Sequence, residues 1–296
     1  MNETLKRGIS GAVYIVLLLA SILFSTESFF VLFGIFLTIA VYEFCSLIQI
    51  RKVVPIIASV LIYTIITLLS FYKNDTELFL SSTFKSLISF DYDSTKINIV
   101  LLVITLVVSV KCILFLFYDN IQSISTSSKY LYLLGYIILP FVFITKISFG
   151  INGYNPKIII GLFILVWTND TFAYIVGKSI GKHKLFERIS PKKTIEGFLG
   201  GIIFAALAGY LISKFYIRAN PSNSEKSILI WVTIALLVGI IGTIGDLIES
   251  KFKRIAGVKD SGKIMPGHGG ILDRLDSVIF VAPFVFLFYQ ILNYVS

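Results

Sequence analysis

The feature that most constrains the fold of this chain is a succession of long apolar segments joined by mostly short polar connections. A helix that crosses a lipid bilayer needs about 20 consecutive apolar residues. Nine segments of the 296-residue chain approach this length, namely 9–25, 29–50, 53–72, 97–118, 130–149, 157–177, 197–217, 227–249 and 275–295. Backbone polar groups must be satisfied inside lipid, so each segment is expected to be helical. The sequence therefore predicts an all-α integral membrane protein with about nine transmembrane helices.

The composition supports this class, because 56% of the residues are hydrophobic and the mean hydropathy is +0.88, far above a soluble domain. The first segment follows Lys6 and Arg7, as in a signal peptide, but no small-residue cleavage site follows it, so we expect a retained helix. We predict one continuous membrane domain, with an N-terminal region at 1–150 and a catalytic region at 151–296. A compact chain of this kind suits a bacterial inner (plasma) membrane.

The distribution of charge predicts the orientation. With the N-terminus in the cytoplasm, most of the 26 Lys and Arg residues fall in cytoplasmic connections, as the positive-inside rule requires. The net charge of +9 has two interpretations: it sets the topology alone, or it also attracts anionic lipid head groups and polyphosphates. We predict membrane lipids as partners and no nucleic acid. Cys45 and Cys112 both lie in apolar segments without metal-ligand spacing, which is typical of small buried hydrophobes.

The richest chemistry lies between the last two apolar segments, in the connection SKFKRIAGVKDSGKIMPGHGGILDRLDS at 250–277. Cations bind phosphates, carboxylates hold hard metals such as Mg²⁺, and glycines let backbone N–H groups approach an anion. The connection therefore predicts a polyphosphate and metal site at a membrane surface. Its charged residues and histidine are Lys251, Lys253, Arg254, Lys259, Asp260, Lys263, His268, Asp273, Arg274 and Asp276.

Acidic residues inside the apolar segments are the second signal, because ionisable groups are costly at membrane depth and are usually functional there. Asp246 and Glu249 are three residues apart and share a helix face, and Asp273 and Asp276 have the same spacing. The two pairs are expected to meet at the cytoplasmic end and to hold one or two hard cations. The alternative is that these acids pair with nearby cations. For Glu43, a structural hydrogen bond between helices and a catalytic role are both open.

A third region, GKSIGKHKLFERISPKKTIEG at 177–197, is strongly basic. Ser190-Pro191 predicts a helix start with proline in the first position. Thr194 and the free N–H groups of that turn are then expected to bind an anion. The alternative is an ordinary basic loop that only obeys the positive-inside rule.

Together these regions resemble the integral-membrane phosphatidate cytidylyltransferases, also called CDP-diacylglycerol synthases. The family signature, S-x-x-K-R-x4-K-D-x5-P-G-H-G-G-x-x-D-R-x-D, is met at every fixed position between Ser250 and Asp276. The strings WTNDTFAYIVGKSIGKHK, SPKKTIEG and GDLIES are also similar to the family. The resemblance covers about residues 157–296, and the first half of the chain matches only as a hydrophobic region.

The resemblance implies the reaction of CTP with phosphatidate to give CDP-diacylglycerol and pyrophosphate, with Mg²⁺ as cofactor; a second cation such as K⁺ and a homodimer are left open. His268 would donate a hydrogen bond to a phosphate or act on a proton, unless it is a structural cap in the glycine-rich turn. The implied residues fall into three groups. Catalytic residues are Asp246, Asp273, Lys259 and His268; metal ligands are Asp246, Asp273 and Asp276; phosphate, nucleotide or lipid ligands are Ser190, Lys192, Lys193, Thr194, Lys253, Arg254 and Arg274.

Three other classes compete with this interpretation. The CDP-alcohol phosphotransferases carry a D-x2-D-G-x2-A-R pattern that this chain lacks, and CTP-dependent lipid kinases are not expected to carry the full PGHGGxxDRxD block. A transporter or flippase would use Glu43, Asp170 and Asp246 as a proton or ion relay. A relay would spread acids over the whole membrane depth, whereas here they gather towards one side.

Overall fold

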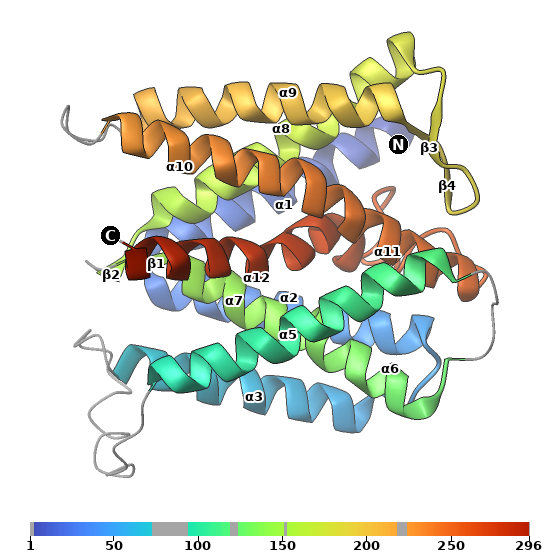
Figure 1. The fold of residues 1–296 in the computed structure, drawn as a ribbon. Helices are drawn as coiled ribbons and strands as arrows, with labels where there is room; N and C mark the ends of the chain where they lie inside the picture. Colours follow the sequence, from blue (N-terminus) through green and yellow to red (C-terminus); the bar gives the residue numbers. More distant parts are fainter. Residues whose placement is uncertain (1–2, 73–93, 119–123, 151–152, 218–223, 296) are drawn as a thin grey trace.

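The computed structural model describes residues 3–72, 94–118, 124–150, 153–217 and 224–295, and it is built almost entirely of helices (Figure 1). The helices are α1 (Glu3–Phe24), α2 (Thr26–Leu47), α3 (Val53–Tyr72), α5 (Ser94–Phe117), α6–η1–α7 (Thr126–Ile147), α8 (Pro156–Ile180), α9–η2 (Ile195–Ile217), α10–η4–α11 (Ser224–Ile255) and α12 (Leu272–Val295). Two antiparallel hairpins join them, β1 (Phe149–Gly150) with β2 (Gly153–Tyr154), and β3 (Lys184–Phe186) with β4 (Ser190–Thr194).

All nine predicted apolar segments are helical in the described part of the chain, and eight of these helices are long and apolar enough to cross a membrane. The remaining one, α3, has a shorter apolar stretch at Val53–Leu68. The prediction of an all-α, multi-pass membrane protein is therefore confirmed.

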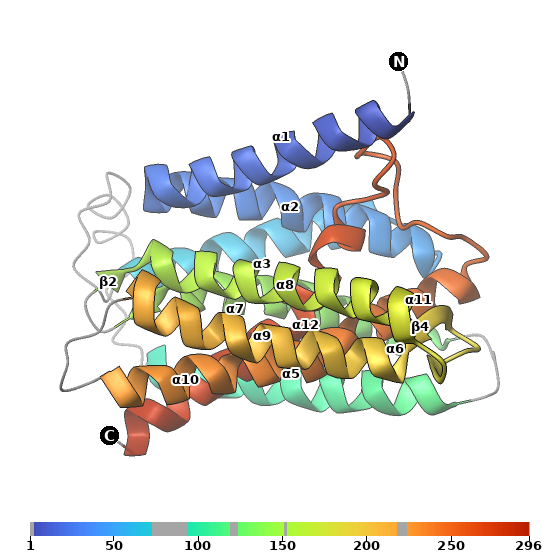
Figure 2. The same ribbon diagram turned by 90° about the horizontal axis from the view of Figure 1, so that it is seen from above.

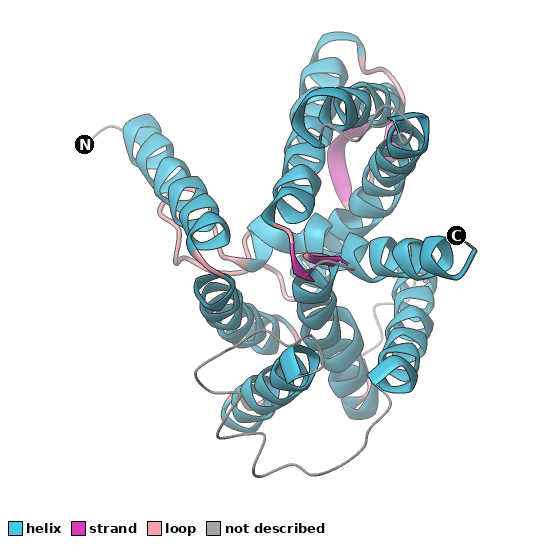
Figure 3. Ribbon diagram, turned by 90° about the vertical axis from the view of Figure 1, so that its left-hand side faces the viewer, coloured by secondary structure: helices cyan, strands magenta, loops and turns pink. Residues whose placement is uncertain are grey.

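The helices run roughly alongside one another, and α12 lies in the interior of the bundle (Figures 1 and 2). It packs against α7, α11, α5 and α2, so contacts join the two halves of the sequence. In contrast α1 lies at the periphery, where it packs mainly on α2 (Figures 2 and 3). The β3–β4 hairpin, the start of α1 and the end of α11 share one end of the bundle, whereas α12 ends at the other (Figure 1).

The eighth apolar helix continues further than its apolar run suggests. It extends to Ile255, so Lys251, Lys253 and Arg254 lie on a helix rather than in the expected loop. The extension is amphipathic: Ile248 and Phe252 are fully buried, and the Phe252 ring packs within 6 Å of four aromatic rings, those of Phe44, Phe115, Tyr132 and Tyr136. This packing stabilises a polar stretch as helix.

The predicted helix start at Ser190-Pro191 is wrong. These residues open strand β4, which pairs with β3 through Lys184 and Thr194 and through Phe186 and Ser190. Helix α9 begins only at Ile195, because the Thr194 side chain accepts a hydrogen bond of 3.1 Å from the Gly197 N–H and forms the N-cap. Pairing in the hairpin therefore prevails over the helix preference of the Ser-Pro pair.

Small residues allow α8 and α9 to pack closely, as is common between helices in membranes. A Cβ atom added to Gly197 would lie 2.6 Å from the carbonyl oxygen of Ala173 and 3.0 Å from the Cα of Gly177. Both neighbours are backbone atoms and cannot move aside as a flexible side chain would. This crossing places the start of α9, and with it strand β4, next to the end of α8.

We predict that Gly197→Ala destabilises the protein by about 1–3 kcal/mol, because the added methyl group separates α8 from α9. The measurement is the melting temperature of the purified protein in detergent. Gly8→Ala is the matched control, since a Cβ at Gly8 meets no atom within 4 Å. Equal melting temperatures for Gly197→Ala and Gly8→Ala would contradict the close packing of the two helices.

Candidate functional site

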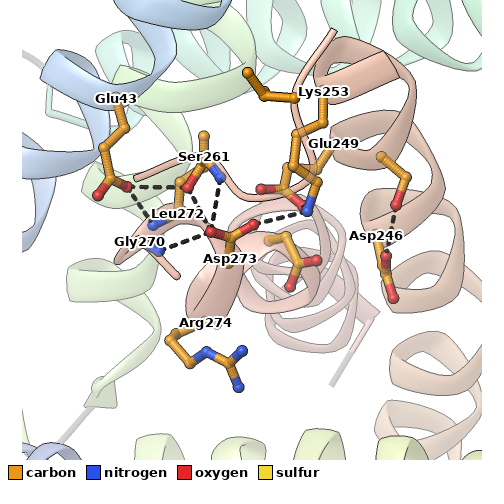
Figure 4. A network of polar contacts seen from close by, with 12 residues as sticks. Glu43, Asp246, Glu249, Lys253, Ser261, Gly270, Leu272, Asp273 and Arg274 are labelled. Carbon is orange, nitrogen blue, oxygen red and sulfur yellow. Dashed lines mark hydrogen bonds and ion pairs between the residues drawn. The ribbon is translucent and has the colours of Figure 1, made fainter. Parts of the chain in front are cut away.

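Three carboxylates from two neighbouring helices form an acidic cluster at the bundle end that carries the β3–β4 hairpin (Figures 1 and 4). Each of Asp246 and Glu249 on α11 and Asp276 on α12 offers an oxygen within 4.8 Å of the other two. The side chain of Glu249 is only 1% exposed. The predicted pairing of Asp246 with Glu249 on one face is thus present, and Asp276 joins them from the second predicted pair.

Two lysines lie against these acids. Lys193 on β4 places its Nζ 2.5 Å from Oδ2 of Asp246, and Lys253 places its Nζ 2.5 Å from Oε2 of Glu249. Lys253 also lies 2.7 Å from Oδ1 of Asp273, so it links the acidic cluster to the first turn of α12, where the connection from α11 ends. The structure therefore brings the basic hairpin and the glycine-rich connection together.

Asp273 differs from its neighbours because hydrogen bonds fill its carboxylate. Its Oδ2 accepts bonds from the backbone N–H of Ser261 at 2.8 Å, from the Ser261 hydroxyl at 2.8 Å and from the Gly270 N–H at 2.7 Å (Figure 4). Lys253 donates a hydrogen bond to the other oxygen of Asp273. Asp273 therefore binds both ends of the glycine-rich turn, Ser261 and Gly270, to the start of α12. Its expected role as a metal ligand stays a prediction, and the geometry groups Glu249, rather than Asp273, with Asp246 and Asp276.

Glu43 on α2 makes the structural contact that the sequence left open. Its carboxylate accepts hydrogen bonds from the N–H groups of Ile271, at 3.2 Å, and Leu272, at 2.9 Å (Figure 4). It also lies 3.2 Å from the hydroxyl oxygen of Ser261, which makes its shorter contact with Asp273. It thus caps the N-terminus of α12 from another helix. Gly270 must be glycine here, because a Cβ atom would collide with the carboxylate of Glu43.

His268 stands in a tight turn that is closed by a 2.9 Å hydrogen bond from its N–H to the Met265 carbonyl. Gly267 and Gly269 on either side have φ of 77° and 85°, a conformation that favours glycine. The His268 Nδ1 lies 2.8 Å from the hydroxyl of Ser10 on α1. Burial, followed by the charges of Arg274 and Arg7, lowers the pKa of His268 below its usual 6.5, which favours the neutral ring at pH 7.

Several other predicted ligands have structural contacts. Arg274 donates hydrogen bonds of 3.2 and 2.8 Å to the His268 carbonyl, and Arg254 donates one of 3.3 Å to the Ile189 carbonyl. Thr194 is buried as the cap of α9. By contrast Lys192 and Lys259 are exposed, and Ser190 is half-buried at the start of β4.

Sequence reasoning missed the contribution of α1. Besides Ser10, this helix supplies Tyr14, which is 9% exposed and whose hydroxyl has no hydrogen-bond partner among the described residues. Tyr14 lies close enough to Arg274 and Asp276 for their charges to act on it. No motif marks Ser10 or Tyr14, because both precede the region of the resemblance. Asp170 on α8, which the sequence did flag, likewise lies within electrostatic reach of Asp246 and Asp276.

The acidic cluster has the chemistry of a cation site. Hard cations such as Mg²⁺ prefer carboxylate oxygens, and three are grouped here. Neither oxygen of the buried Glu249 makes a well-aligned hydrogen bond within the described residues, although Lys253 is close to one of them. Because a buried charge without sufficient partners is costly, a bound cation would satisfy this cluster. The residues present therefore fit a metal ion.

Fold and site together define an integral membrane protein with a phosphate- and metal-compatible site at one end of its helical bundle. The chain matches the model of the Cytidylyltransferase family over residues 5–292, nearly its whole length, and it belongs to this family. The family membership predicted from the signature is confirmed.

Curated relatives from three staphylococci carry the name phosphatidate cytidylyltransferase. The chain is 50% identical over 121 residues to those of Staphylococcus aureus (strain COL) and Staphylococcus haemolyticus (strain JCSC1435), which is 41% of this chain and 44% of each relative. It is 47% identical over 127 residues to that of Staphylococcus epidermidis (strain ATCC 12228), which is 43% of this chain and 46% of the relative. The aligned region spans less than half the length of each of these relatives.

We predict that Glu43→Gln lowers the melting temperature and weakens protection of the 259–271 connection against proteolysis. The glutamine amide has only one acceptor oxygen, so the buried N–H of either Ile271 or Leu272 loses its acceptor. The expected loss of folding free energy is roughly 1–3 kcal/mol. Glu27→Gln is the control, being the same exchange at an exposed position of the same helix. Indistinguishable proteolysis of the two variants would argue against the capping role.

Proposed function

We propose that this protein is a phosphatidate cytidylyltransferase, which converts CTP and phosphatidate to CDP-diacylglycerol and pyrophosphate. The observation that carries the proposal is the acidic cluster of α11 and α12, with Lys193 of the basic hairpin and Lys253 of the family signature against it. Three grouped carboxylates, of which the buried Glu249 lacks well-aligned hydrogen bonds among the described residues, suit a divalent cation, and lysines suit phosphates. The names of the staphylococcal relatives agree with this reaction.

The location of the site suits both substrates. Phosphatidate is a membrane lipid with an anionic head group, whereas CTP is soluble, so the two can meet only at a membrane surface. We assign the end with the β3–β4 hairpin and the start of α1 to the cytoplasm, because basic residues favour that side. A bacterial inner membrane would then expose the site to the cytoplasmic CTP supply.

In the proposed reaction, an oxygen of the phosphatidate phosphate forms a bond to the α-phosphorus of CTP. The bond between the α-phosphorus and the oxygen that bridges to the β-phosphorus breaks, and pyrophosphate leaves. Catalysis of this kind depends on positioning and on neutralising charge. Asp246, Glu249 and Asp276 would hold Mg²⁺, with the predicted ligand Asp273 beside them, and the ion would neutralise phosphate oxygens when bound. A second cation such as K⁺ and a homodimer remain predictions.

In this proposal the exposed cationic side chains bind substrate phosphates, and those already bonded to the protein hold the site together. Lys192 and Lys259 are exposed and free to reach an arriving triphosphate or head group, whereas Lys193 would exchange its contact with Asp246 for a substrate phosphate. Lys253 and Arg254 would act mainly by holding the site together, since both are engaged by neighbouring groups. Arg274 would hold the turn of His268 through its carbonyl.

The experiment that tests the function is pyrophosphate release by purified protein in mixed micelles with phosphatidate, Mg²⁺ and CTP, with ATP as control. Release that requires both CTP and phosphatidate, with a CDP-lipid product, supports the proposal. Release from CTP without lipid indicates a nucleotide hydrolase, and transfer of the γ-phosphate to a lipid alcohol indicates a kinase. A folded protein without turnover that moves substrate into vesicles would overturn the proposal in favour of a transporter.

We predict that Asp246→Asn reduces turnover at least roughly 100-fold, because it removes a charge that stabilises the bound cation. The melting temperature should not fall, because the exchange also removes repulsion within the acidic cluster. Steady-state rates and thermal unfolding in the same detergent check both statements. The control Glu225→Gln, an exposed acid on α10, should leave both unchanged. Near-normal turnover of Asp246→Asn would refute the assignment of the cation site.

A further inference from the structure

Ser10 connects α1, at the periphery of the bundle, with the turn that carries His268. Its hydroxyl oxygen lies 2.8 Å from the His268 Nδ1, 3.0 Å from the Pro266 carbonyl oxygen and 3.1 Å from the Arg7 carbonyl oxygen of its own helix. Ser10 and Pro266 are 256 positions apart in the chain, so only the tertiary fold creates this contact.

The protons available to this group of atoms select one form of the imidazole. A hydroxyl donates one proton, and both carbonyl oxygens can only accept. If Ser10 donated to Nδ1, two carbonyl oxygens would face the Ser10 oxygen at hydrogen-bond distance without a proton between them. If Nδ1 carries the proton and donates to Ser10, the hydroxyl proton is free to satisfy the Pro266 or Arg7 carbonyl. The second arrangement satisfies more groups, so it is the stable one.

A neutral ring protonated on Nδ1 has a lone pair on Nε2. Burial of the His268 ring disfavours its doubly protonated, cationic form. The positive charges of Arg274 on α12 and Arg7 on α1 disfavour this form as well. His268 therefore has an acceptor, not a donor, at Nε2. The tautomer of a histidine is commonly set in this way by the partner of its other nitrogen.

We propose that Ser10 is a positioning residue that holds His268 as the Nδ1–H tautomer, so that Nε2 accepts a hydrogen bond from a protonated phosphate oxygen of the lipid head group. This rests on the proposed function for the identity of the ligand. It also decides between the two roles open to His268, since an acceptor cannot donate to a fully ionised phosphate. Helix α1 thereby becomes part of the site.

The backbone of α1 leaves little space for a side chain beside the ring. A Cβ atom at Gly11 would lie 3.3 Å from Cε1 and 3.6 Å from Nε2 of His268, whereas one at Gly8 would meet no atom within 4 Å. Gly11→Ala and Gly8→Ala are therefore the same exchange on the same helix, three residues apart, and only the first touches the imidazole. This pair separates an effect on His268 from an effect on helix stability.

The direct test is ¹⁵N NMR of histidine-labelled protein in lipid nanodiscs at about pH 8, where the shifts of the two ring nitrogens distinguish the tautomers. The chain has two histidines, and His183, with its Nδ1 2.7 Å from the Glu196 carboxylate, is the internal reference. We expect wild-type His268 to be protonated on Nδ1, Ser10→Thr to preserve this form, and Ser10→Ala to populate the Nε2–H form. Protonation of Nε2 in the wild type, or no response to Ser10→Ala, overturns the proposal. This measurement needs no substrate, so its outcome is independent of the proposed reaction.

The kinetic test is a double-mutant cycle of Ser10→Ala and His268→Gln, assayed as phosphatidate-dependent pyrophosphate release. We expect Ser10→Ala to lower kcat roughly tenfold with little change in the KM for CTP, and to have no further effect in the His268→Gln background. Gly11→Ala should lower kcat and Gly8→Ala should not. Additive losses in the cycle would show that Ser10 acts only on folding and would refute its positioning role.

Discussion

Two buried carboxylates, Glu43 and Asp273, organise the connection between α11 and α12 through backbone N–H groups. Between them they accept hydrogen bonds from the backbone N–H groups of Ser261, Gly270, Ile271 and Leu272. The N-terminus of α12 supplies a favourable field for both. The shape of the glycine-rich turn, and therefore the position of His268, depends on these contacts.

The carboxylates of the acidic cluster differ from Glu43 and Asp273 in how many hydrogen-bond partners the protein gives them. Glu43 and Asp273 have their oxygens satisfied by the protein, whereas the buried oxygens of Glu249 lack well-aligned partners among the described residues. Inside a bundle of apolar helices such an imbalance is expensive, and it is tolerated where a ligand completes it. The protein thus separates carboxylates whose oxygens accept its own hydrogen bonds from the acidic cluster, for which we propose a bound cation.

Much of the fold could be read from the chain because bilayer-length apolar segments leave the backbone few alternatives. The nine segments, and the convergence of Asp246 and Asp276, followed from hydropathy and from a three-residue spacing. Sequence reasoning was less successful where packing prevailed over local pattern. The amphipathic end of α11 is helical because Phe252 is buried among aromatic rings, and Ser190-Pro191 is a strand because β3 lies beside it.

The sequence by itself determined the class, the family and the residue types of the site, because the signature between Ser250 and Asp276 is contiguous and each residue type has its own chemistry. Only the tertiary structure decided that Glu249 rather than Asp273 completes the acidic cluster, that Glu43 caps α12, and that Ser10 reaches His268. The contacts of Glu43 and of Ser10 join positions more than 200 residues apart. No local spacing encodes such pairs, since they depend on how the helices pack and on where each buried polar group finds a partner.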